Sequence, residues 1–93
     1  MFTIKYTGTF KKDLKILKKR SVEDFELLRS FVKELATNEG AEIPEKHLAH
    51  KLKGKYARHH ECHVLPDLLL IWMENRKAGT ITLVRTGTHS DLF

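Results

Sequence analysis

The segment Leu68–Met73 (LLLIWM) is the longest uninterrupted apolar run in the chain, and it restricts the possible folds more than any other feature. Six residues are far too few to span a bilayer as a helix. A strand in the middle of a sheet is covered on both faces, so it is continuously apolar instead of alternating. Turn signals flank the run, with Pro66-Asp67 before it and Asn75 to Gly79 after it. The run therefore predicts a central strand covered on both faces.

Two helices are expected in the N-terminal half. Apolar residues recur there at helical spacing in two stripes, the first made of Phe10, Leu14 and Leu17 and the second of Phe25, Leu28, Val32 and Leu35. Thr9 is placed to cap the first helix, and Ser21 with Asp24 forms a relaxed capping box at the start of the second. We therefore expect two antiparallel helices joined by a tight turn.

The remaining predicted elements are strands. Phe2 to Tyr6 alternates apolar and polar residues, which predicts a short N-terminal strand. The C-terminal half adds four candidate strands at 50–53, 56–65, 68–74 and 80–85, while 41–49 suits a helical turn or a plain loop equally well. The predicted order is β-α-α-β-β-β-β, an α+β fold in which the two N-terminal helices pack on one face of a small antiparallel sheet.

The chain is basic, with 17 Lys and Arg against 12 Asp and Glu among 93 residues. This length predicts a single domain over residues 1–93, with little room for an enclosed substrate cavity. The segment Lys11–Arg20 carries a net charge of +5, and Lys46 to His60 holds five Lys and Arg, four His and no acid. Such clusters attract polyanions, although a solvated helix face explains the first equally well. One cysteine and no apolar signal segment lead us to expect a cytoplasmic protein without membrane association.

Five of the six histidines lie between His47 and His63. The HHECH run at 59–63 has the residue types of a zinc site, but on a strand His59 and His63 face one side while His60 and Cys62 face the other, so four ligands do not converge. The same alternation turns the neighbouring histidines away from Cys62, which favours a small core residue over a nucleophile. We therefore expect no metal and no other cofactor.

The histidines also suit acid–base cleavage of RNA through its own 2′-hydroxyl. That reaction needs a proton acceptor, a proton donor and a cation for the phosphorane; histidine serves either proton role near neutrality, and arginine is a bidentate partner for phosphate. His63 shares a strand face with Glu61, Asp67 lies at the next turn, and Arg85 precedes His89 by four positions. Spacing alone does not prove convergence: each histidine also suits a surface or core position, Asp67 suits turn chemistry and Arg85 a strand-end salt bridge.

Two motifs in the C-terminal half resemble a known family. The stretch from His50 to Asp67, which ends in HVLPD, and the later RTGTH with a terminal LF closely resemble the YafQ branch of the RelE-like toxins of bacterial toxin–antitoxin systems. The N-terminal YTGTFKKDLK fits the same pattern, so the resemblance covers essentially the whole chain. It implies a small sheet with two helices packed on it. It also implies an mRNA interferase, an endoribonuclease that typically cleaves messenger RNA during translation on the ribosome.

The resemblance also implies roles for individual residues. The positions that match the family's acid–base residues are His50, His63, Asp67 and His89. Of these, His89 is the expected general acid for the leaving 5′-oxygen, and the expected base is His50, or His63 with Asp67 beside it. The expected RNA contacts are Arg85 at the scissile phosphate, Phe93 on a base, and Lys53 nearby, with Glu61 supporting the site.

Leu68 departs from relatives that carry an aromatic residue directly after the aspartate, a change that weakens base stacking or alters codon preference. The implied partners are messenger RNA, the ribosome and a cognate antitoxin whose acidic segment covers the basic active-site face. Two alternatives stay open: a non-catalytic RNA- or ribosome-binding module, and a ParE-like toxin that acts on gyrase. The histidine set argues against both, because a pure binder needs no cluster of titrating groups around one arginine.

Overall fold

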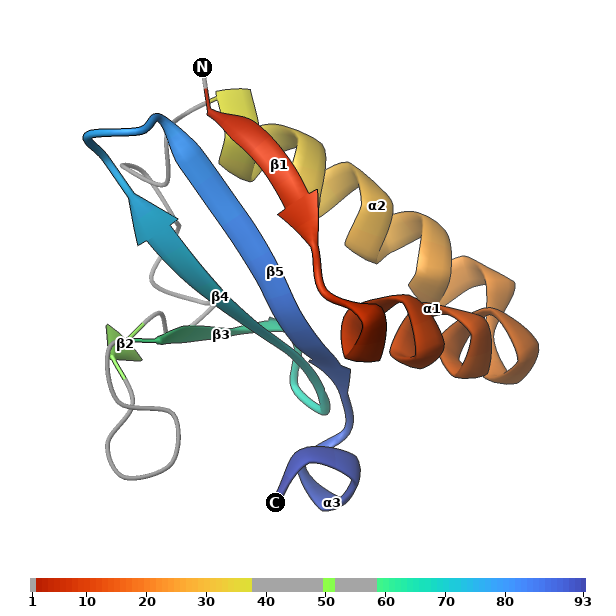
Figure 1. Cartoon of the computed structure of the whole chain (residues 1–93). Coiled ribbons are helices and arrows are strands. Elements are labelled where there is room, and N and C mark those ends of the chain that lie inside the picture. The colour runs from red at the N-terminus through yellow and green to blue at the C-terminus, as the bar shows by residue number, and fades with distance from the viewer. Residues whose placement is uncertain (1, 38–49, 52–58) are drawn as a thin grey trace.

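Three helices and five strands make up the part of the chain that the computed structural model describes, residues 2–37, 50–51 and 59–93. In chain order they are β1 (Thr3–Tyr6), α1 (Gly8–Arg20), α2 (Val22–Thr37), β2 (His50–Lys51), β3 (His60–Leu65), β4 (Leu68–Asn75), β5 (Thr80–Gly87) and α3 (His89–Leu92). α1 and α2 form a layer beside β1, and α3 lies at the far end of β5 (Figure 1). None of these helices is long and apolar enough to cross a membrane.

The five strands form one sheet in the order β1-β5-β4-β3-β2. β2, β3, β4 and β5 pair antiparallel with their neighbours, whereas β1 runs parallel to β5, with Thr3 opposite Thr80. The α+β class and the predicted order of elements are confirmed, and the predicted antiparallel pairing holds for the four C-terminal strands. The N-terminal edge differs, and the sheet is mixed. No hairpin joins β1 to β5, so nothing imposes the antiparallel direction there.

β4 is the central strand that the apolar run predicts. Leu68, Leu70 and Trp72 pack into the core beneath α1 and α2, while Leu69 and Ile71 pack on the opposite face with Leu92 of α3 among their contacts. All five β4 residues are almost fully buried. Since burial of one such side chain contributes about 1.5–3 kcal/mol, this strand alone supplies a large part of the hydrophobic stabilisation.

The start of α1 lies two residues earlier than predicted. The Thr7 side chain, not that of Thr9, accepts the Phe10 N–H at 3.0 Å, and the helix begins at Gly8. The Thr7 hydroxyl also donates to the Val84 carbonyl of β5 at 3.0 Å. This second bond ties the cap to the sheet edge, which explains why tertiary contact selects Thr7.

Ser21 is the single residue between α1 and α2. Its N–H donates to the Leu17 carbonyl at 2.8 Å and closes the first helix, while its hydroxyl accepts the Asp24 N–H at 3.1 Å and opens the second. The predicted tight connection and the side-chain cap at Ser21 are therefore confirmed.

Candidate active site

The sheet face that α1 and α2 leave uncovered carries several of the predicted site residues. The strand register places Glu61 opposite Ile71, and Ile71 opposite Arg85; in the next row His63 lies opposite Leu69. The alternate residues of β3 pack into the core beneath the helices, so Glu61 and His63 face the other way. The prediction that these two side chains share a strand face is confirmed.

His63 and Glu61 are close enough to act together. His63 Nε2 lies 4.0 Å from Glu61 Oε1, and His63 Nδ1 lies 3.3 Å from the Pro66 carbonyl oxygen. In the tautomer whose Nδ1–H donates to that carbonyl, Nε2 carries the lone pair and can accept a proton. The Glu61 side chain is only 7% exposed. An imidazolium formed at His63 therefore has a largely buried carboxylate beside it.

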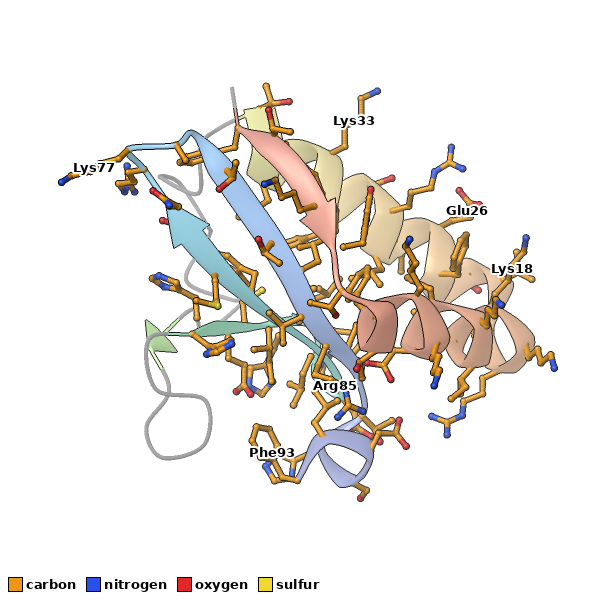
Figure 2. The ribbon with its side chains drawn as sticks, viewed as in Figure 1. Lys18, Glu26, Lys33, Lys77, Arg85 and Phe93 are labelled. Carbon is orange, nitrogen blue, oxygen red and sulfur yellow. The ribbon has the colours of Figure 1, made fainter. Side chains whose placement is uncertain are left out.

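The chain ends in a helix that the strand and helix patterns did not predict. In α3 the Thr88 hydroxyl accepts the Asp91 N–H at 3.1 Å, and the Asp91 carboxylate accepts the Thr88 N–H at 3.0 Å, which makes a capping box. The ring centroids of His89 and Phe93 are 5.1 Å apart. Phe93 is 59% exposed and caps the C-terminal end of α3, where Figure 2 labels it. This helix therefore presents an imidazole next to an exposed aromatic ring.

Asp67 connects the two sequence motifs in space. Its Oδ1 accepts the backbone N–H of His89 at 3.1 Å, across 22 positions of the chain. The family resemblance led us to expect Asp67 beside His63 in the role of base. The bond in the structure goes instead to the backbone of His89, so Asp67 fixes the start of α3 against the turn before β4.

Arg85 is bound to Asp13 of α1. Arg85 Nε donates to Asp13 Oδ2 at 2.8 Å, Nη2 donates to Oδ1 at 3.2 Å, and the Thr86 N–H donates to Oδ2 at 3.1 Å. Val84 is an extra residue in β5, because Ile71 pairs with Arg85 and Trp72 with Leu83. Arg85 thus forms the strand-end salt bridge that the sequence left open as an alternative, and this salt bridge fixes the plane of the guanidinium.

A hollow of about 210 Å³ lies where α1, α3, the end of β5 and the turn before β4 meet. Its lining includes two predicted site residues, Asp67 and Arg85, and Figure 2 shows Arg85 close to α3. Arg20 and Asp91 also line it and form a second bidentate pair, at 2.7 Å and 3.2 Å. The Arg20 guanidinium, together with the Thr88 N–H, holds the pKa of Asp91 well below its usual range.

The thiol alternative does not fit the structure. Cys62 is fully buried, and burial, with the nearby Glu61 carboxylate, raises the pKa of its thiol to about 12. The thiol is therefore protonated at neutral pH, which agrees with the prediction of a small core residue.

Two histidines of the HHECH run, His60 and His63, lie on opposite faces of the sheet, as the strand alternation predicts. His60 stacks on Trp72 with ring centroids 5.5 Å apart, on the helix-covered side of the sheet. His63 lies on the other face, beside Glu61. Within residues 2–37, 50–51 and 59–93, no three or more His, Cys, Asp or Glu side chains are grouped as metal ligands.

Lys53 lies outside the described residues, and His50 is described only by its place in β2, opposite Glu61. Sequence reasoning missed Asp13, Arg20 and Asp91. Asp13 had a signal: it is the single acid in the basic segment Lys11–Arg20, and it falls on the apolar stripe of the helix.

Solved structures identify the class to which this fold belongs, the small toxins of bacterial toxin–antitoxin systems. A metal-bound toxin from Helicobacter pylori matches with a TM-score of 0.86 and 43% identity, covering all of both chains. YafQ from E. coli strain BL21(DE3) matches with a TM-score of 0.84 and 30% identity, covering 100% of this chain and 99% of that one. YafQ in the E. coli DinJ-YafQ complex matches with a TM-score of 0.83, 31% identity and the same coverage.

Sequence comparison gives the family. The model of the family described as "Bacterial toxin of type II toxin-antitoxin system, YafQ" matches residues 2–93. The mRNA interferase toxin YafQ of E. coli K12 is 33% identical over 90 residues, which are 97% of this chain and 94% of that protein. This chain belongs to the YafQ family of type II toxins, as its two motifs indicated.

Proposed function

We propose that this chain is an mRNA interferase, the endoribonuclease toxin of a type II toxin–antitoxin system, and that it cleaves RNA by acid–base attack of the 2′-hydroxyl. The E. coli relatives are named mRNA interferase toxins. The observation that carries the mechanism is the 3.1 Å bond from the His89 N–H to Asp67. It joins the HVLPD turn to α3 and so brings the candidate residues of two distant segments to one end of the sheet.

The reaction needs two proton transfers, and the candidate residues divide between them. His63 Nε2, or an imidazole at His50, takes the proton of the 2′-hydroxyl, and the 2′-oxygen attacks the phosphorus. The P–O5′ bond breaks, and the His89 imidazolium gives its proton to the leaving 5′-oxygen. The products are a 2′,3′-cyclic phosphate and a 5′-hydroxyl. Glu61 stabilises the imidazolium at His63, while Asp67 acts as a positioning residue through the backbone of His89.

Arg85 and Phe93 are proposed to hold the RNA around the scissile bond. Asp13 fixes the guanidinium of Arg85 from one side, and further N–H groups of a guanidinium can donate to a phosphate oxygen. The exposed ring of Phe93 offers a face on which an unpaired base can stack. The two residues differ in effect, because Arg85 binds the reacting phosphate whereas Phe93 orients the neighbouring nucleotide.

The exposed basic face of α1 is proposed to bind the larger partners. Its side chains are exposed and cationic: Lys11, Lys12, Lys15, Lys18 and Lys19. Figure 2 shows Lys18 directed away from the sheet. Such a face suits ribosomal and messenger RNA in the cytoplasm, and it equally suits an acidic segment of an antitoxin. The E. coli relative forms a complex with DinJ, which supports a cognate antitoxin for this chain.

End-labelled messenger RNA, incubated with and without translating ribosomes, tests the proposal. Wild-type protein should produce 2′,3′-cyclic phosphate ends, with free RNA also tested in excess EDTA. His89→Ala should lower the cleavage rate by about a hundred- to ten-thousand-fold and leave RNA affinity largely unchanged. Ser90→Ala, an exposed neighbour on the same helix, is the matched control and should cleave like wild type. Intact RNA in every lane, bound by the wild-type protein, would contradict the proposal and leave a non-catalytic binding module.

A further inference from the structure

Arg20 and Asp91 connect two parts of the fold that lie 71 positions apart in the chain. Arg20 is the last residue of α1, and Asp91 lies in α3. Nη1 donates to Oδ2 at 2.7 Å and Nη2 donates to Oδ1 at 3.2 Å, a fork-to-fork arrangement of guanidinium and carboxylate. We propose that this pair, the α3 latch, positions His89 for proton transfer by holding α3 against the end of α1.

α3 needs such a contact because it cannot be stable alone. It has four residues, whereas isolated helices shorter than ~12–15 residues are marginal in water. Other contacts that hold it are the burial of Leu92, the bond from His89 to Asp67, and the capping box of Thr88 with Asp91. Of these, the capping box shares its carboxylate with the latch. Loss of Arg20 therefore weakens two restraints on α3 at once.

The Asp91 carboxylate is confined from a further direction by Gly87. The φ angle of Gly87 is +150°, and a Cβ built on it would lie 2.9 Å from Asp91 Oδ2 and 3.2 Å from Asp91 Cβ. Only glycine leaves the room that Asp91 occupies next to β5. The Asp91 carboxylate thus accepts hydrogen bonds from Arg20 and from the Thr88 N–H and packs against Gly87 at the end of β5. Together these contacts define the direction in which α3 leaves the sheet.

The latch acts on catalysis through position. Proton transfer requires the donor within hydrogen-bond distance of the leaving oxygen, and a displacement of about 1 Å can cost about a hundred-fold in rate. His89 is the first residue of α3, so a change in the direction of the helix moves its imidazole. The inference rests on the proposed function to the extent that His89 is the general acid.

Arg20 has a competing role as a direct phosphate ligand, since its side chain is 52% exposed on the basic helix. The two roles predict different couplings. If Arg20 acts only through Asp91, removing either partner breaks the same contact and the double variant resembles the single ones. If Arg20 binds RNA by itself, its effect falls on RNA affinity and is independent of Asp91.

The test compares Arg20→Gln, Asp91→Asn and their double variant with the wild type and with Lys19→Gln. Glutamine removes the guanidinium and leaves an uncharged polar side chain, while asparagine keeps the size of aspartate and retains an oxygen that can accept the Thr88 N–H. Lys19→Gln removes the same charge from the neighbouring exposed position on α1. Two readouts are taken: kcat and KM on the RNA that the wild type cleaves, and amide hydrogen exchange at Leu92 and Phe93, whose N–H groups bond to Thr88 and His89 carbonyls.

Each latch variant should lower kcat by about tenfold, leave KM within about a factor of two, and speed amide exchange in α3. The double variant should match the single ones, and Arg20→Lys should recover part of kcat. Lys19→Gln, on the proposed RNA-binding face of α1, should keep the wild-type kcat and α3 exchange and raise only KM. Unchanged kcat, multiplicative losses in the double variant, or a rise in KM with kcat and α3 exchange unchanged, the pattern expected of Lys19→Gln, would overturn the proposal. If the wild type cleaves no RNA, the proposed function fails, and unchanged exchange in α3 would separately refute the latch.

Discussion

Replacing Asp13 with alanine tests how strongly one buried carboxylate holds α1, β5 and Arg85 together. Asp13 accepts three hydrogen bonds, two from the Arg85 guanidinium and one from the Thr86 N–H. The Asp13 side chain is only 10% exposed and that of Arg85 is 23% exposed. β1 pairs with β5 only as far as Leu83, so no strand lies beside Thr86 on that side. Asp13 therefore provides the acceptor that a neighbouring strand would otherwise give the Thr86 N–H.

The cost follows from those contacts. Thr86 is almost fully buried, and a buried N–H without an acceptor costs about 1–3 kcal/mol. Breaking a buried ion pair costs about 3–5 kcal/mol, but water reaches part of the Arg85 guanidinium and reduces this figure. We therefore expect Asp13→Ala to lower the free energy of unfolding by about 2–4 kcal/mol. That is a large share of the roughly 5–15 kcal/mol typical of a small domain.

Urea unfolding at pH 7 measures this change through the midpoint at constant m-value. Asp13→Asn keeps an oxygen that can accept the Thr86 N–H but loses the charge. It should therefore lower the free energy of unfolding by about half as much as Asp13→Ala. In a double-mutant cycle with Arg85→Gln, the pair should show a coupling energy of about 1–3 kcal/mol.

Additive losses in that cycle, or a cost for Asp13→Ala below about 0.5 kcal/mol, would refute the reasoning. The result also governs how activity data for Arg85 are interpreted. An Arg85 variant loses both a proposed phosphate contact and a stabilising pair, whereas Asp13→Asn loses mainly the second. Cleavage that falls much further in Arg85→Gln than in Asp13→Asn, at matched folded fraction, isolates the phosphate contact.

Four further predictions follow from single features of the structure. Cys62 should resist iodoacetamide at pH 8 until urea unfolds the protein, because burial raises the pKa of its thiol to about 12; rapid alkylation of the native state would contradict this. The depressed pKa of Asp91 means that its contribution to stability is complete above the ordinary pKa of 3.8 and is lost as pH falls through the lower folded pKa. Carboxyl NMR should therefore show the Asp91 carboxyl titrating below its usual range, and Arg20→Gln should move that titration upward. Lys15→Gln should weaken RNA binding slightly and reduce the slope of log K against log salt by about 1, without changing kcat. Gly87→Ala should both destabilise the protein and reduce cleavage, since its Cβ would collide with Asp91; wild-type values in urea unfolding and RNA cleavage would show that α3 adapts.

The sequence was sufficient for features that depend on local pattern. The apolar run Leu68–Met73 identified the central strand, and alternation along β3 separated Cys62 from His63. The predicted N-cap of α1 was wrong by two residues, because Thr7 and Thr9 are the same residue type and either side chain can cap a helix. The contact of Thr7 with Val84, 77 positions away, distinguishes them only in the folded state.

The parts of the candidate site that were missed depend on pairs distant in the chain. Asp13 and Arg85 are 72 positions apart, and their individual positions indicated a basic helix and a strand end but not their contact. A lone acid on an apolar helix stripe is a usable signal for a buried partner. α3 had a signal as well, since Thr88 followed by Asp91 is a capping-box pattern. Asp67 was identified, but which group of His89 it binds depends on the exit direction of α3.

The central claim, that His89 protonates the leaving oxygen, is tested most directly by changing the leaving group. A substrate with sulfur in place of the bridging 5′-oxygen, at the cut site mapped with the wild type, expels a thiolate that needs no proton. Wild type and His89→Ala should then cleave the sulfur substrate at nearly equal rates, while the oxygen substrate keeps the difference of about a hundred-fold or more. An equally large loss on both substrates would contradict the account, because it would place His89 outside the protonation of the leaving group.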